Sequence, residues 1–125
     1  MRNPDPARSL PSHIAMAWPT LTVIIRAGGS ATNAEIVAAV ADDLHLSEVQ
    51  RALLLKPRGS RTLLDYRLAW SRTLLHNMRA ITNDGLCHWS VTDLGYKTTP
   101  EDIERFTKAM YETLGERSKA QNSSK

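Results

Sequence analysis

The sequence has one cysteine, one phenylalanine and no apolar run long enough to cross a bilayer. Cys87 has no second cysteine to form a disulfide within the chain, which is typical of proteins from a reducing compartment. Residues 1–9 lack the apolar segment of a signal peptide. These absences argue against a disulfide-stapled fold or a membrane-spanning protein, and they predict a cytoplasmic one.

Basic residues are missing from residues 31–50, which carry four acids: Glu35, Asp42, Asp43 and Glu48. Between residues 56 and 79 the balance reverses, because six Lys and Arg residues accompany a single acid, Asp65. The formal net charge of +3 hides this separation. A basic segment beside a neutral to acidic remainder is typical of a surface that faces a polyanion. A chain of 125 residues with 42% hydrophobic residues fits one domain around one core.

Three helices are predicted before residue 56. The first is apolar and runs from about residue 12 to the glycine pair at 28–29, with Pro19 expected to kink or restart it. A second helix to about residue 44 and a short third helix through residues 53–55 follow. Each begins with a capping box, Thr32 with Glu35 and Ser47 with Gln50. The sequence KPRGS then forces a turn.

The stretch Ser60 to Ile81 is predicted to be a long helix with one buried face. Leucines at 64, 68, 74 and 75 and a methionine at 78 form its apolar stripe. The opposite face is rich in hydrogen-bonding groups and has a small residue, Ala69, at its centre. Its members are Thr62, Asp65, Tyr66, Ala69, Arg72, Thr73, His76 and Asn77.

A change of period after residue 81 predicts a β-hairpin. Asp84-Gly85 is a strong hairpin turn signal, and residues 87–92 alternate between apolar and polar. Helices, a turn, a long helix and then a hairpin form the order of a winged helix-turn-helix, whose helix before the hairpin can enter a DNA major groove. The predicted fold is therefore mainly α with a small β-hairpin: a winged helix-turn-helix plus a C-terminal helix.

The C-terminal helix is predicted over residues 99–117, with a cap at Thr99 and one apolar stripe. The stripe could fold back on the body, pair with a second copy or dock another protein. A homodimer through it is attractive because it would double a small DNA interface. We expect a flexible tail at 1–10, the winged-helix domain at 11–98, a loop at 93–98 and a disordered tail at 118–125. The stripe consists of Ile103, Phe106, Met110 and Leu114.

Four segments of the chain resemble the N-terminal domain of Mrr-type restriction proteins, over roughly Leu10 to Tyr96. They are LPSHIAMAWPTL, GGSATNAEIVAAVADDLHLSEVQRALLL, GSRTLLDYRLAWSRTLL and WSVTDLG. The resemblance implies a winged helix that binds DNA, usually fused to a nuclease domain that cleaves modified DNA. In this sequence the chain stops where such a nuclease would begin, and it lacks an Asp followed by an Asp/Glu-x-Lys pair to hold magnesium. We expect no catalysis.

The site predicted from charge and reach lies at the turn and along the long helix. Lys56, Arg58, Ser60, Arg61 and Thr62 would contact phosphates near the helix N-terminus. Tyr66, Ala69, Arg72 and Thr73 could reach base edges, and His76 could touch a phosphate or remain merely solvated. The predicted hairpin is the wing of this fold. Because it has an acid, Asp84, at its tip, we expect it to bind phosphate poorly. The alternative function is a protein-interaction module that docks a separate nuclease or other partner.

Other residues favour structural roles. Arg67 is expected near the buried edge of the long helix, stacked on an aromatic ring. The three tryptophans, Trp18, Trp70 and Trp89, are expected in the core. Cys87 and His88 would point to opposite sides of a strand, so we expect a core cysteine and no metal site or cofactor.

Overall fold

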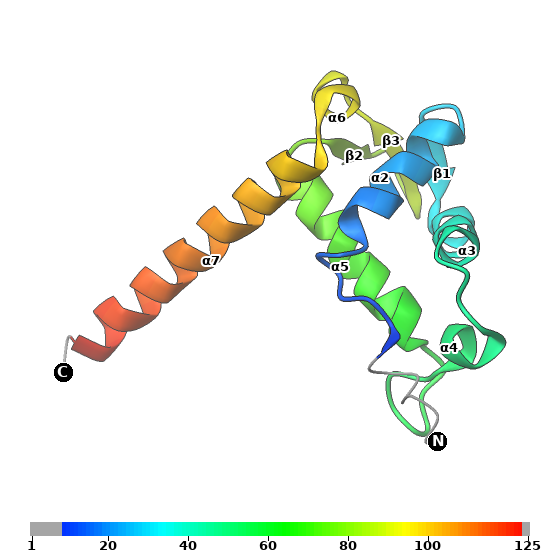
Figure 1. Ribbon diagram of the computed structural model, residues 1–125, viewed down its shortest axis with the longest axis horizontal. Helices are drawn as coiled ribbons and strands as arrows, with labels where there is room; N and C mark the ends of the chain where they lie inside the picture. The colour runs from blue at the N-terminus through cyan, green and yellow to red at the C-terminus, as the bar shows by residue number, and fades with distance from the viewer. Residues whose placement is uncertain (1–8, 124–125) are drawn as a thin grey trace.

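The computed structural model describes the backbone of residues 9–123 and the side chains of residues 9–114 (Figure 1). It confirms the predicted fold class: a mainly helical chain with a small antiparallel sheet, in a winged helix-turn-helix layout with a C-terminal helix. The elements are α2 (Ala17–Arg26), β1 (Ser30–Thr32), α3 (Asn33–Asp43), α4 (Glu48–Ala52), α5 (Leu63–Asn77), β2 (Ile81–Asn83), β3 (His88–Val91), α6 (Asp93–Lys97) and α7 (Pro100–Ser123).

The core lies where α2 packs against α3 and α5. The large side chains at its centre include Leu21, Ile24, Ile36 and Leu68, all fully buried. Burying one such side chain stabilises the fold by about 1.5–3 kcal/mol. Leu10 also belongs to this core at 3% exposure, so the tail predicted at 1–10 does not extend to its last residue; residues 1–8 lie outside the described residues.

Helix α2 begins later than predicted because the first segment contains two elements. A turn comes first, in which the Met16 N–H donates to the carbonyl oxygen of Ser12 at 3.0 Å. Pro19 is then the third residue of α2, in the first turn, where a missing N–H breaks no helical hydrogen bond. The first helix is interrupted as predicted, but α2 begins at Ala17, two residues before Pro19, and Pro19 does not mark the restart.

The two predicted capping boxes are both present. Thr32 and Glu35 exchange hydrogen bonds at the start of α3, and Ser47 and Gln50 do so at the start of α4. The backbone and side-chain hydrogen bonds from Thr32 lower the pKa of the exposed Glu35 carboxyl. The two helices therefore start where local hydrogen bonding dictates.

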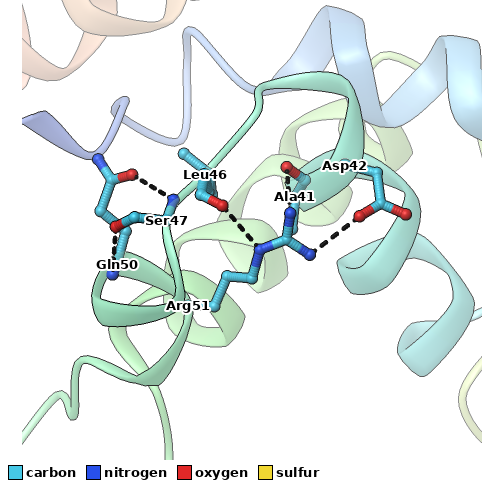
Figure 2. Close-up of polar contacts among 6 residues, drawn as sticks. All are labelled: Ala41, Asp42, Leu46, Ser47, Gln50 and Arg51. Atoms are coloured by element: carbon cyan, nitrogen blue, oxygen red, sulfur yellow. Dashed lines mark hydrogen bonds and ion pairs between the residues drawn. The ribbon is translucent and has the colours of Figure 1, made fainter.

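Arg51 joins the end of α3 to α4 (Figure 2). Its Nε donates to the Leu46 carbonyl oxygen at 2.9 Å, and Nη2 donates to that of Ala41 at 3.2 Å. Nη1 pairs with the Asp42 carboxylate at 2.9 Å. The Ala41 carbonyl oxygen also accepts the Leu46 N–H at 3.0 Å, so the guanidinium adds a second hydrogen bond at this end of α3. It fixes the direction in which α4 leaves α3.

The sheet contains the predicted hairpin and one strand that the sequence did not reveal. Its order is β1-β3-β2, and both pairings are antiparallel. Strand β1 is three residues long, too short to show an alternating pattern, and it places Ala31 opposite Trp89. It ties the start of α3 to the wing.

Residues 93–98 are mostly helical, so the prediction of a loop there is wrong. The Thr92 hydroxyl accepts the Gly95 N–H at 3.0 Å and donates to the Arg79 carbonyl oxygen at 2.6 Å. A Cβ atom added at Gly95 would lie 2.1 Å from the Ala80 carbonyl oxygen. Only glycine permits this close approach of α6 to the segment that connects α5 to β2.

Helix α7 packs its first turns against α2 and then extends away from the rest of the molecule (Figure 1). The predicted cap is present: Thr99 and Asp102 exchange hydrogen bonds, and these lower the pKa of Asp102. Ile103 is buried and Phe106 is half-buried. The helix runs to Ser123, past the predicted end at 117 and into the segment predicted to be disordered. No helix among the described residues is long and apolar enough to span a membrane.

Candidate nucleic-acid interface

The basic turn, Lys56–Ser60, is the tip of a loop held closed by the backbone. The Leu55 N–H donates to the Arg61 carbonyl oxygen at 2.9 Å, and the Leu63 N–H donates to that of Leu53 at 2.8 Å. The third helix therefore ends at Ala52 and not at residues 53–55 as predicted, because those residues are extended. The closed loop presents the basic turn at the N-terminal end of α5.

The turn itself is tight and well defined. The Gly59 N–H donates to the Lys56 carbonyl oxygen at 3.0 Å, and Pro57 occupies the second position, where its fixed φ suits a β-turn. Lys56, Arg58 and Ser60 are exposed, and neither Lys56 nor Arg58 forms an ion pair with any described residue. Two cations therefore face solvent without a counter-ion.

Arg61 and Thr62 connect this turn to the first turn of α5. Arg61 Nε binds the Asp65 carboxylate at 2.8 Å, and its guanidinium lies over the Tyr66 ring at 5.5 Å. The Thr62 hydroxyl accepts the Asp65 N–H at 3.0 Å and so caps the helix, while its own proton can still be donated.

The exposed face of α5 differs from the predicted face at both edges. Thr73, His76 and Asn77 are exposed, and Tyr66 and Ala69 are half-buried. The Thr73 hydroxyl donates to the Ala69 carbonyl oxygen at 3.0 Å. The exposed face also includes Trp70, whose ring meets Tyr66 edge to face at a centroid distance of 6.4 Å. Trp70 is 49% exposed, so its prediction as a core residue is wrong.

Arg72 is not on the exposed face, and its predicted exposure is wrong. The residue is 5% exposed, and its guanidinium lies over the Trp89 ring at 5.9 Å. On the helix it lies between the apolar stripe and the exposed face, and β3 covers it there. Its burial lowers the pKa of the guanidinium. In this conformation Arg72 cannot reach a base edge.

Arg67 and Ser71 attach α5 to the segment before α2. Arg67 Nη1 donates to the carbonyl oxygens of Leu10 at 2.6 Å and Pro11 at 3.2 Å, and the Ser71 hydroxyl donates to that of His13 at 2.6 Å. A structural role for Arg67 is confirmed. The partners are backbone carbonyls, however, and not the aromatic ring that the sequence suggested.

The outermost residue of the wing is apolar. Leu86 is 98% exposed, and Asp84 accepts a hydrogen bond from the Ser90 hydroxyl and lies 3.5 Å from His88 Nδ1.

Cys87 is exposed with a φ of 60°, so the prediction of a core cysteine is wrong. Trp89 is half-buried and donates to the Asn33 side chain at 2.7 Å. Residues 81–91, which form the hairpin, contain no Lys or Arg.

A family model for the Mrr N-terminal domain matches residues 15–101. The chain belongs to this family. Comparison with curated proteins and comparison with solved structures each gave no match. The matched region extends from the turn before α2 into the start of α7, and it includes the basic turn, α5 and the wing. Membership indicates a module of the DNA-binding type, related to restriction-modification proteins.

In this Mrr N-terminal domain, α7 borders one edge of α5 and leaves its centre open. Met110 lines a hollow of about 70 Å³ together with Trp70, Thr73 and Asn77. Beyond that contact α7 diverges from α5 (Figure 1). Among the described residues of the domain, no three His, Cys, Asp or Glu side chains converge as metal ligands would.

Proposed function

We propose that this Mrr N-terminal domain binds double-stranded DNA without catalysing a reaction, as a regulator or as a reader of DNA that can carry modified bases. The observation that supports this most strongly is the basic turn, where Lys56 and Arg58 face solvent without a counter-ion beside the first turn of α5. Uncompensated cations at a helix N-terminus favour phosphate.

The phosphate contacts would come from five neighbouring residues. Arg61 must leave Asp65 to join them, but ion pairs between exposed side chains contribute only about 0.2–1 kcal/mol. The hydroxyls of Ser60 and Thr62 can donate to phosphate oxygens. These contacts fix the orientation of α5 on the duplex, and they involve Lys56, Arg58, Ser60, Arg61 and Thr62.

Base contacts would come from the exposed face of α5 in the major groove. Ala69, at the centre of this face, lets the helix approach closely, and its methyl group can meet a thymine methyl. Thr73, His76 and Asn77 supply polar groups, and the exposed Trp70 joins them as an addition to the predicted set. Membership in a restriction-related family makes modified bases the first variable to test.

Amide chemical shifts of ¹⁵N-labelled protein, titrated with a 20-base-pair duplex, test the proposal. We expect the largest shifts in residues 56–62 and at Ala69, Thr73 and His76, because these would lie against DNA. Matched duplexes with plain, methylated and hydroxymethylated cytosine then show whether a modification changes affinity. Shifts confined to α7, or none with any duplex at low salt, would contradict the proposal.

The second candidate is a protein-interaction module, favoured by two features of α7: exposed apolar side chains in its middle and a hollow beside its first turns. Leu114 is 51% exposed and Tyr111 is 48% exposed, and a hollow of about 500 Å³ opens between α7 and the residues Ile14 and Trp18. A separate nuclease or a second copy could dock there. Homodimer formation through the apolar stripe of α7 remains a prediction. In the same spectra, without DNA, a homodimer would make the chemical shifts of α7 amides depend on protein concentration.

A further inference from the structure

The buried guanidinium of Arg72 has hydrogen-bond donors without acceptors. Among the described residues, buried side-chain nitrogens without a partner occur only on this residue, at Nε and Nη1. A buried N–H without an acceptor costs free energy, and a charged one costs more than a neutral one. Burial lowers the pKa of Arg72, whereas the nearby charge of Asp65 raises it. If this position served packing alone, an apolar side chain would stabilise the fold more than arginine does.

The guanidinium lies at the junction of α5 and the wing. Trp89 of β3 stacks on it, and the charges that act on it most are those of Asp65 and Arg61. Asp65 is the acid among them, but its carboxylate is bound by Arg61 at 2.8 Å and makes no hydrogen bond to Arg72. The single carboxylate of Asp65 therefore acts on both guanidinium groups, through a direct ion pair with Arg61 and through its charge on Arg72.

We propose that Arg72 and Arg61 together form a binding site for one backbone phosphate of a DNA duplex, at the junction of α5 and the wing. The inference rests on the proposed function. When a helix occupies a groove, the phosphodiester strand that borders the groove runs along the edge of the helix and not along its exposed centre. Arg72 lies on such an edge. On binding, the Arg72 side chain would rotate away from the Trp89 ring to reach the phosphate. The same phosphate would replace Asp65 as the counter-ion of Arg61.

The substitution Arg72→Met separates this role from packing. Methionine keeps the apolar stem and removes the unmet donors, so the thermal midpoint should stay the same or rise. Duplex affinity should fall about tenfold, because a charge-assisted hydrogen bond is lost. The slope of log affinity against log salt should become shallower by about 0.9, which is the loss of one phosphate contact. Arg26→Met, the same change on α2, removes an exposed ion pair with Asp43 and should leave the salt slope unchanged and the affinity within about twofold.

The Arg72 Nε–H signal in ¹⁵N–¹H spectra of the wild-type protein gives a test that needs no folded variant. Duplex should shift it, whereas the Arg67 signal, from a side chain bonded to backbone carbonyls, should stay in place. Inorganic phosphate at millimolar concentration should leave the Arg72 signal unchanged; a shift with phosphate alone would assign the site to a free anion and overturn the proposal.

The outcomes also separate this inference from the proposed function. If the wild-type protein binds no duplex, both fail. If it binds duplex but the Arg72 signal does not move, or Arg72→Met binds with unchanged affinity and salt slope, only the phosphate site at Arg72 is overturned.

Discussion

Replacing Lys56, Arg58 and Arg61 together with alanine is expected to weaken duplex binding about 500-fold at about 0.1 M salt. Each phosphate contact releases condensed counter-ions and contributes about eightfold at that salt concentration, and three contacts multiply. The three side chains are exposed, so the free energy of unfolding should change by no more than about 0.5 kcal/mol per residue. Fluorescence anisotropy with a labelled duplex measures the loss.

A matched variant separates local contacts from total charge. Arg26, Arg105 and Lys108 are also exposed, and they lie on α2 and α7, away from the basic turn. Replacing these three with alanine removes the same formal charge and should weaken binding only a few-fold through the long-range field. Equal losses in both triple variants would show that the basic turn has no special role.

The substitution Leu68→Ala is expected to lower the free energy of unfolding by about 2–5 kcal/mol. Leu68 is 0% exposed and lies in the core where α5 packs against α2, so the truncated side chain leaves a cavity. A loss of this size is a large share of the total stability of about 5–15 kcal/mol expected for a domain. Urea denaturation followed by circular dichroism measures it.

Thr73→Ala is the control on the opposite face of the same helix. Thr73 is exposed, and its hydroxyl bonds only to the helix backbone, so the substitution should change stability by no more than about 0.5 kcal/mol. If Leu68→Ala and Thr73→Ala had similar small effects on the free energy of unfolding, the buried leucine face of α5 would not anchor the helix in the core.

The sequence predicted the features that depend on neighbours along the chain. Capping boxes such as Thr32 with Glu35 and the turn at Asp84-Gly85 are local, so both were identified correctly. Strand β1 and helix α6 were missed because three and five residues show no period. Gly95 gave no signal either, since its need for a small residue comes from the distant Ala80 carbonyl.

The two edges of α5 show why the site was predicted only in part. Periodicity gives the angle of each residue around the helix, but it does not show how far the neighbouring elements extend. Arg72 and Trp70 both lie beside the apolar stripe of α5. Arginine is usually exposed and tryptophan usually buried, so the sequence suggested an exposed Arg72 and a buried Trp70. The structure reverses both, because Trp89 covers Arg72 whereas α7 leaves Trp70 half open. The turn residues were easier to predict, since KPRGS lies between elements and no element covers it.

If the proposed function is correct, the basic turn and the exposed face of α5 lie against a duplex. The most direct measurement is the affinity of the wild-type protein for an unmodified duplex at several potassium chloride concentrations. Contacts with about three to five phosphates predict a slope of log affinity against log salt of about −3 to −4.5. An affinity that does not change with salt, or no binding at the lowest salt concentration, would contradict the account.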